Sequence, residues 1–208
     1  IDVERALAKV QARLGLIPQE ACDEIVSHCE LDQIDMVRLR QQTERIGYPI
    51  LGVVTQINQL CRDKLGEFVH WGATTQDITD TATVLQIREA LVLVDDELAA
   101  IANALAKLAK EHRLTPVIGR SNLQQAIPVT FGYKMAGLLS AVQRHQERLT
   151  QLKPRVLVGE FAGAAGTLAS LQTGAMATQA GLCEALGLGQ PVIAWHTIRD
   201  NIAEVGAF

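Results

Sequence analysis

The sequence predicts an all-α fold, in which a small N-terminal helical domain precedes a bundle of long helices. Two stretches of the 208 residues carry apolar side chains at alternating steps of three and four. This heptad spacing is typical of helices that pack along their whole length against other helices. Aromatic residues make up only 4% of the chain, and alanine and leucine are frequent, which disfavours a β-sandwich or barrel.

The first 70 residues predict four short helices joined by short links. Residues 2–14 form an amphipathic pattern that ends at Gly15. Pro18 suits the first turn of a second helix, where its missing N–H group costs nothing. A third helix is expected over about residues 32–46, and a fourth opens at residues 48–49. We expect these helices to form an N-terminal domain over residues 1–70.

The first heptad pattern predicts one long helix over residues 78–112, after a loop over residues 66–75. Its apolar positions are Val84, Ile87, Leu91, Val94, Leu98, Ile101, Leu105 and Leu108. Such a helix would be about 50 Å long. The pattern stops at residues 115–116, because proline disfavours a helical conformation in the residue before it.

Residues 113–128 are predicted to be a polar connection between two long helices. The second heptad pattern follows it and is expected to end at Pro154. Its positions are Phe131, Met135, Leu138, Val142, His145, Leu149 and Leu152. Two long helices joined in this way pack antiparallel.

The remaining residues complete a predicted bundle domain over residues 71–208. Glycine is dense over residues 158–167, a third helix is expected over residues 168–186, and residues 195–200 are expected to form the first turns of a fourth. These helices are too few to cover both heptad patterns. We therefore expect a symmetric homo-oligomer in which other copies of the chain complete the core.

Charge and composition exclude several classes of partner. The formal net charge is −4 and no basic block is present, which argues against nucleic-acid binding. No apolar run approaches the roughly 18 residues of a membrane span. Cys22, His28 and Cys29 lack further ligands nearby for a zinc site. We expect no metal, and we interpret the four cysteines as buried free thiols of a protein in the reducing cytoplasm.

A cluster of polar residues stands at the start of the long helix. Thr74, Thr75, Gln76 and Asp77 lie where free backbone N–H groups and the positive end of the helix dipole gather. This arrangement predicts an anion site. The hydroxyls and the carboxylate can equally serve as helix caps, and both roles can coexist. The nearby His70 is either a proton donor or a structural residue that orients the loop.

Three motifs resemble conserved regions of the fumarase/aspartase superfamily. They are His-Trp-Gly-Ala-Thr-Thr-Gln-Asp (70–77), Gly-Arg-Ser-Asn-Leu-Gln-Gln-Ala-Ile-Pro-Val-Thr-Phe-Gly (119–132) and Gly-Ala-Ala-Gly-Thr (163–167). The resemblance extends over nearly the whole chain. It is strongest to 3-carboxy-cis,cis-muconate cycloisomerases, with similarity also to adenylosuccinate lyases.

The resemblance implies a homotetramer with a twenty-helix core, active sites assembled from three subunits, and no metal or organic cofactor. It also implies a reaction in which a proton leaves the carbon beside a carboxylate of a small polycarboxylate and a β group is then expelled, or the reverse addition. The doubly charged intermediate needs fixed hydrogen-bond donors.

The motifs place the family's site residues at specific positions of this chain. His70 and Gln125 stand at the predicted catalytic positions. The predicted substrate-binding residues are Thr74, Thr75, Gln76, Asp77, Arg120, Ser121, Asn122, Gln124, Thr167 and Arg199. Arg199 suits a second carboxylate, which it can bind with two parallel hydrogen bonds, or it pairs with Asp200 or another acid. His196 is a further residue that can reach the site.

Several positions depart from the family pattern. Asn122 and Gln125 occupy positions where different branches carry a histidine, and an amide cannot protonate a leaving group near neutral pH. Residues 49–50 are Pro-Ile, where adenylosuccinate lyases have His-Asp, which counts against that activity. The mobile serine loop, whose serine the family is thought to use as a base, is not found before Phe208. We therefore expect this chain to be part of a longer protein.

Two alternatives to a cycloisomerase remain open from the sequence. One is a C–N lyase that releases fumarate, similar to adenylosuccinate lyase. The other is a catalytically inactive helical assembly module that keeps the bundle but has lost its acid.

Overall fold

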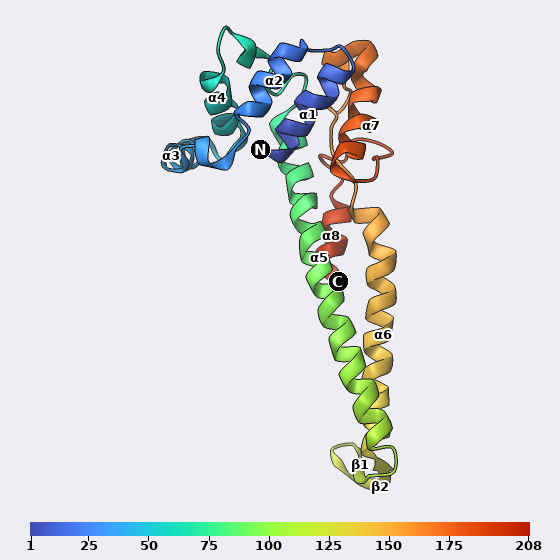
Figure 1. Cartoon of the computed structure of the whole chain (residues 1–208). Coiled ribbons are helices and arrows are strands. Elements are labelled where there is room, and N and C mark those ends of the chain that lie inside the picture. Colours follow the sequence, from blue (N-terminus) through green and yellow to red (C-terminus); the bar gives the residue numbers. More distant parts are fainter. The chain divides into compact units, whose positions relative to one another are not determined.

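The computed structural model describes residues 1–208, and it is mainly helical, as predicted (Figure 1). The α-helices are α1 (Asp2–Arg13), α2 (Gln19–Ser27), α3 (Met36–Ile46), α4 (Ile50–Leu60), α5 (Thr75–Glu111), α6 (Phe131–Val156), α7 (Ala175–Leu186) and α8 (Asp200–Ala207). Short 3-10 segments are η1 (Leu31–Gln33), η2 (Leu65–Phe68) and η3 (Ala169–Gly174). The strands are β1 (Pro116–Ser121) and β2 (Gln124–Thr130).

The chain divides into two compact units. The first comprises Ile1–Gln86 and Leu157–Ala203, and the second comprises Ile87–Val156 and Glu204–Phe208. Helix α5 belongs to both. This division does not test the domain boundary expected between residues 70 and 71, which stays a prediction. None of the helices combines the length and apolar character needed to cross a bilayer.

The first unit has a core built from the predicted amphipathic helices. Val3 and Leu7 of α1 are buried together with Leu182 of α7. A second cluster, which includes Ile25 and Ile57, packs α2 and α4. These side chains come from the apolar faces that the helical period predicts, and their removal from water stabilises the unit.

The third predicted helix is shorter than expected. It begins at Met36 because Asp35 is its N-cap, and the Asp35 carboxylate accepts hydrogen bonds from the backbone N–H groups of Val37 and Arg38, both at 3.0 Å. Residues before the cap form η1 instead. Gly47 ends the helix in the left-handed conformation, as glycine at this position commonly does.

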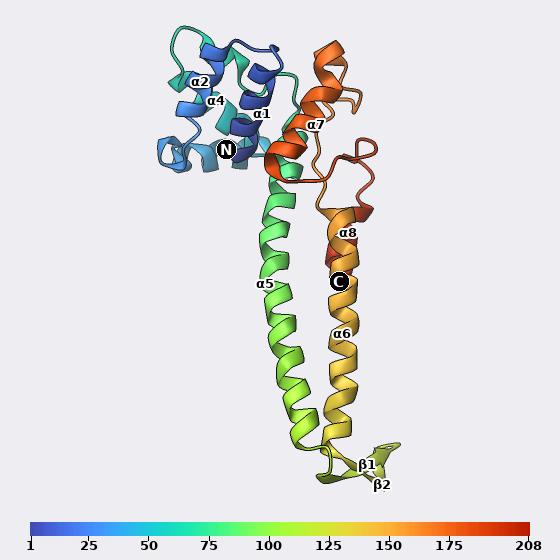
Figure 2. The same ribbon diagram turned by 45° about the vertical axis from the view of Figure 1, so that its right-hand side comes forward.

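In the second unit, the two long helices run in opposite directions, as Figure 2 shows. They approach closely at Gly132, where a side chain would collide with the backbone of Ala109 and Arg113. Leu149 of α6 is fully buried, whereas Leu138 and Ile101 on the heptad patterns keep 54% and 46% of their surface exposed. This single chain therefore covers the patterns only in part.

Residues 113–128 do connect the two long helices, but most of this segment forms strands, which the sequence did not predict. β1 and β2 form an antiparallel hairpin there, with Ser121 opposite Gln124 and a register irregularity between Ile118 and Arg120. Asn122 and Leu123 make the turn with φ values of 51° and 64°. Two positive φ values are typical of a type I′ turn, which usually carries Asn-Gly. Because Leu123 stands where such a turn usually has glycine, the sequence did not indicate a hairpin.

Three further boundaries differ from the predictions. Pro154 lies inside α6, which continues to Val156. The proline is in the last turn of the helix, where the missing backbone N–H costs only one hydrogen bond. The helix expected over residues 168–186 is split, because Gln172 has non-helical angles and α7 starts only at Ala175. The last helix begins at Asp200, so residues 195–199 are a loop.

Candidate functional site

A cavity of about 530 Å³ opens at the start of α5, within the first unit. Three segments line it: the helix start, the glycine-rich segment and the loop before α8. The lining residues are Thr74, Thr75, Gln76, Ala164, Ala165, Gly166, Ile193, Ala194, His196 and Thr197. Three of the predicted substrate-binding residues, Thr74, Thr75 and Gln76, therefore share one cavity.

The start of α5 is fixed by a helix cap. Thr74 precedes the first helical residue, and its backbone N–H donates to Oδ2 of Asp77 at 2.8 Å. This is one half of a capping box, in which the third helical residue binds the backbone of the cap residue. The cap leaves the side chains of Thr74 and Thr75 on the cavity wall. The stretch therefore does act as a helix cap, and substrate binding by Thr74 and Thr75 stays a prediction.

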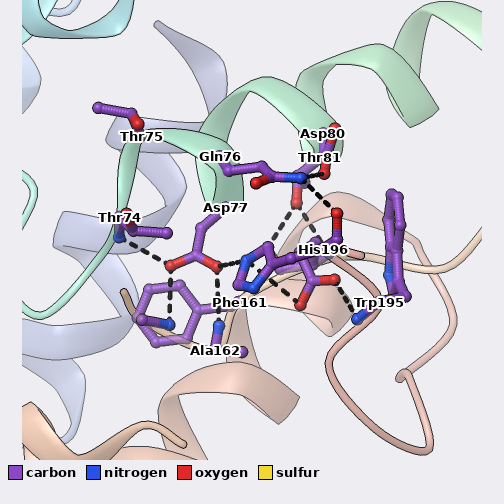
Figure 3. Close-up of polar contacts among 12 residues, drawn as sticks. Thr74, Thr75, Gln76, Asp77, Asp80, Thr81, Phe161, Ala162, Trp195 and His196 are labelled. Atoms are coloured by element: carbon purple, nitrogen blue, oxygen red, sulfur yellow. Dashed lines mark hydrogen bonds and ion pairs between the residues drawn. The ribbon is translucent and has the colours of Figure 1, made fainter. Parts of the chain in front are cut away.

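Asp77 is fully buried and does not line the cavity. Its carboxylate also accepts hydrogen bonds from the backbone N–H groups of Ala162, at 2.8 Å, and Gly163, at 3.0 Å. Its Oδ1 lies 2.7 Å from Nε2 of His196 (Figure 3). Asp77 therefore joins all three cavity segments, and its predicted contact with substrate stays a prediction.

His196 lies on the cavity wall and is held from two sides. Its Nε2 faces Asp77, and its backbone carbonyl accepts a hydrogen bond from Nε2 of Gln76 at 2.8 Å. A second carboxylate, that of Glu160, places Oε1 3.8 Å from the same ring nitrogen. His196 was predicted only as a residue that can reach the site, and its contact with Asp77 was not, because the two residues lie 119 positions apart.

Glu160 is a buried carboxyl group with an unsatisfied oxygen. Its Oε2 accepts a hydrogen bond from the Trp195 backbone N–H at 2.6 Å, whereas Oε1 has no hydrogen-bond partner. Burial raises the pKa of Glu160, and the Trp195 N–H and the nearby His196 offset part of that rise. The backbone of Glu160 is fixed by the Thr81 hydroxyl, which donates to its carbonyl oxygen at 2.8 Å and accepts from its N–H at 2.9 Å.

Arg199 pairs with an acid other than Asp200. Its guanidinium forms a two-point ion pair with Asp80 of α5, and it lies 5.1 Å above the ring of Trp195. Gln76 Nε2 donates to the same Asp80 carboxylate at 3.0 Å. Arg199 is not among the cavity-lining residues, so its predicted contact with a second carboxylate stays a prediction.

His70 orients the loop before α5. Its Nδ1 lies 2.6 Å from Oε1 of Glu4, a buried residue of α1, and its backbone has a φ of 62°. Gln11 of the same helix donates to the Trp71 carbonyl oxygen at 2.7 Å. Because His70 does not line the cavity, this contact supports the structural alternative, and its catalytic role stays a prediction.

The hairpin residues do not contribute to this cavity. All five belong to the second unit and are exposed: Arg120, Ser121, Asn122, Gln124 and Gln125. Thr167 of the glycine-rich segment is also exposed and does not line the cavity. Their predicted roles stay predictions.

Asp77, Glu160 and His196 place potential ligand atoms within 4.8 Å of one another, but their surroundings do not fit a cation. Three backbone N–H groups already point at the Asp77 carboxylate. Together with His196 they occupy two lone pairs on each Asp77 oxygen, which leaves none for a metal ion. These three side chains are therefore better suited to a hydrogen bond between His196 and Asp77 than to a metal site.

Comparison with known proteins identifies the class of this chain. The family model described as lyase matches residues 1–207. The chain therefore belongs to this lyase family, within the fumarase/aspartase (fumarate lyase) superfamily, as the motifs predicted. It is an enzyme family, and a helical bundle is its fold.

Individual relatives are similar over essentially the whole chain. Trans-aconitate decarboxylase 1 of Mycosarcoma maydis is 53% identical over 208 residues, which cover 100% of this chain and 42% of the relative. 3-Carboxy-cis,cis-muconate cycloisomerase of Pseudomonas aeruginosa is 42% identical, covering 98% and 45%. The crystal structure of a fumarate lyase from Mesorhizobium sp. BNC1 superposes with a TM-score of 0.94 at 52% identity, covering 98% and 48%. The chain thus spans less than half the length of these relatives.

Proposed function

We propose that the cavity binds one carboxylate of a small polycarboxylate and that the protein catalyses addition or β-elimination at the adjacent carbon, as a 3-carboxy-cis,cis-muconate cycloisomerase does. The observation that carries this proposal is the start of α5 within the cavity, with Thr74, Thr75 and Gln76 on its wall. Backbone N–H groups of a first helical turn have no partner inside the helix. Together with the hydroxyls of Thr74 and Thr75, they supply donors for a carboxylate that gains negative charge during the reaction.

The names of the relatives support a polycarboxylate substrate but not one reaction. They include a trans-aconitate decarboxylase, muconate cycloisomerases, N-acetyl-S-(2-succino)cysteine lyases and adenylosuccinate lyases. Each name denotes a compound with more than one carboxylate or a succinyl group. A site that recognises a carboxylate and stabilises charge on it serves all of these reactions.

The residues favour a cycloisomerase over an adenylosuccinate lyase. Pro49 is the N-cap residue of α4, and Ile50 is buried in the core of the first unit. Neither can replace the His-Asp pair that the resemblance assigns to adenylosuccinate lyases at this position. An inactive assembly module is disfavoured because the donors at the start of α5 are all retained.

The same proposal includes a homotetramer that works in the cytoplasm without a cofactor. The half-exposed apolar residues of the heptad patterns, such as Leu138 and Ile101, support burial against other copies of the chain. Four free cysteines support a reducing compartment.

A turnover assay with Thr75→Ala tests the proposal. The wild-type oligomer is expected to consume 3-carboxy-cis,cis-muconate, which is followed by its ultraviolet absorbance. Removal of one fixed donor should lower kcat/KM by roughly 10²-fold. Thr83→Ala is the matched control, because Thr83 is exposed on the same helix and bonds only to the Thr79 carbonyl oxygen.

Two outcomes contradict the proposal. One is unchanged turnover in Thr75→Ala with the oligomer intact. The other is the absence of both turnover and binding of any polycarboxylate by the wild type, with trans-aconitate tested beside 3-carboxymuconate.

A further inference from the structure

Two polar side chains of α1 are buried in the first unit. Glu4 and Gln11 are 1% and 0% exposed, on a helix whose other buried residues, such as Val3 and Leu7, are apolar. They are seven residues apart, which is two helical turns, so they share one face of α1. Burial of a carboxyl or amide group is unfavourable unless the group is hydrogen-bonded. The contacts of these two side chains therefore decide what they contribute.

Both side chains bind the same short loop, residues 70–73, which leads into α5. Glu4 Oε1 lies 2.6 Å from Nδ1 of His70, and Gln11 Nε2 donates to the Trp71 carbonyl oxygen at 2.7 Å. His70 and Trp71 are adjacent, but they lie 66 and 60 positions from their partners in the chain. Helix α1 therefore holds this loop at two neighbouring points.

The conformation of the loop depends on such contacts. His70 and Gly72 have positive φ values of 62° and 71°. The left-handed region is unfavourable for a residue with a side chain, so the surrounding structure has to hold His70 there. Within the loop itself, the Ala73 N–H donates to the His70 carbonyl oxygen at 3.1 Å. Loss of a contact from α1 therefore favours other conformations of the loop.

The Gln11 amide is satisfied on one side only. Its Oε1 is buried and has no hydrogen-bond partner, so the desolvation of this oxygen is not offset by a bond. Methionine has a similar length and no polar atom that must be satisfied, so it can fill the same space. The contact of Gln11 with Trp71 is therefore expected to contribute little to the stability of the fold.

We propose that Glu4 and Gln11 are positioning residues, which fix residues 70–73 and thereby set where the hydroxyls of Thr74 and Thr75 stand in the cavity. Thr74 directly follows the loop, and both threonines line the cavity. A hydroxyl binds a carboxylate only within a narrow range of distance and angle, so a displaced loop weakens carboxylate binding. This inference rests on the proposed function, because its readout is the binding of a polycarboxylate.

Gln11→Met is the first test, made in the assembled protein. The variant keeps the packing of α1 and removes the contact with Trp71. Its affinity for tricarballylate, a saturated tricarboxylate that cannot react, should fall about tenfold, the loss expected for one well-placed hydrogen bond. Calorimetric titration measures this affinity. The midpoint of thermal unfolding should change little.

Gln56→Met is the matched control. Gln56 is also buried, and its side chain binds the backbone N–H and carbonyl groups of Asp35, outside the cavity. Because Gln56 satisfies both groups, its loss should lower the thermal stability more than Gln11→Met does. The affinity for tricarballylate should stay within about twofold of the wild type, since distant sites rarely couple. A purely structural role of Gln11 would leave the affinity unchanged in both variants.

Two variants of Glu4 provide a second test. Glu4→Met removes the contact with His70, and it should also weaken tricarballylate binding about tenfold. Glu4→Gln keeps the contact, because an amide offers a donor and an acceptor and so fits either tautomer of the imidazole. It should restore most of the lost affinity. Equal affinities in the two variants would contradict a role for this contact.

The outcomes separate this inference from the proposed function. If the wild type binds tricarballylate and both methionine variants of α1 bind it equally well, the inference is overturned and the proposed function stands. The same follows if Gln56→Met weakens binding as much as they do, or if Gln11→Met fails to fold. If the wild type binds no polycarboxylate, the proposed function is overturned, and this inference falls with it.

Discussion

Asp77 determines how the residues of the cavity are arranged. It accepts hydrogen bonds from Thr74, Ala162 and Gly163 and contacts His196, so one carboxylate connects the helix start, the glycine-rich segment and the loop before α8. A buried carboxylate is stable only when it is paired in this way. The same residue that caps α5 therefore also positions His196.

Gly72 shows how tightly the loop before α5 is packed. Its φ is +71°, and a Cβ atom there would lie 2.5 Å from the side chain of Leu171. Gly72→Ala is expected to lower the free energy of unfolding by about 2–4 kcal/mol, the sum of backbone strain and overpacking. Thermal and denaturant unfolding measure this loss.

Gly15 is the matched control for Gly72. It has the same φ of +71°, but nothing lies within 4 Å of a Cβ atom at this position. Gly15→Ala should therefore cost only the backbone strain, about 1 kcal/mol. Equal losses in the two variants would show that Leu171 does not restrict the loop.

At the scale of elements, α5 and α6 carry more apolar surface than this chain covers. Leu138 on α6 and Ile101 on α5 lie on the heptad patterns and remain about half exposed. Helices with a heptad pattern bury its apolar side chains against further helices. The proposed homotetramer supplies such helices from other copies of the chain.

Leu138→Glu should weaken the association of the chain, because it places a charge in an apolar helix interface. Sedimentation of the wild type is expected to give the mass of a tetramer, and the variant should dissociate at protein concentrations at least tenfold higher. Gln143→Glu is the control, since this residue is exposed on α6 and off the heptad pattern. A monomeric wild type would rule out the shared bundle.

At the scale of the whole molecule, the helical period made most of the fold predictable. The apolar spacing over residues 84–108 predicts α5, and Gly15 and Gly47 mark helix ends that the structure confirms. The hairpin of β1 and β2 was missed because its turn uses Leu123 in place of glycine. Local sequence carries no signal for such an exception.

The candidate site was predictable only where its residues are close in sequence. Thr74, Thr75 and Gln76 are adjacent, and the start of a helix is a recognisable position. The contacts of His196 with Asp77 and of Arg199 with Asp80 each join residues 119 apart. Such pairs depend on tertiary packing, which no short motif specifies.

A crystal structure of the protein with tricarballylate tests the central claim most directly. The account predicts one carboxylate at the start of α5, with an oxygen within about 3.2 Å of the Thr75 hydroxyl or of a backbone N–H group of the first helical turn. A saturating ligand bound elsewhere, with the cavity of Thr74–Gln76 and His196 empty, would contradict it.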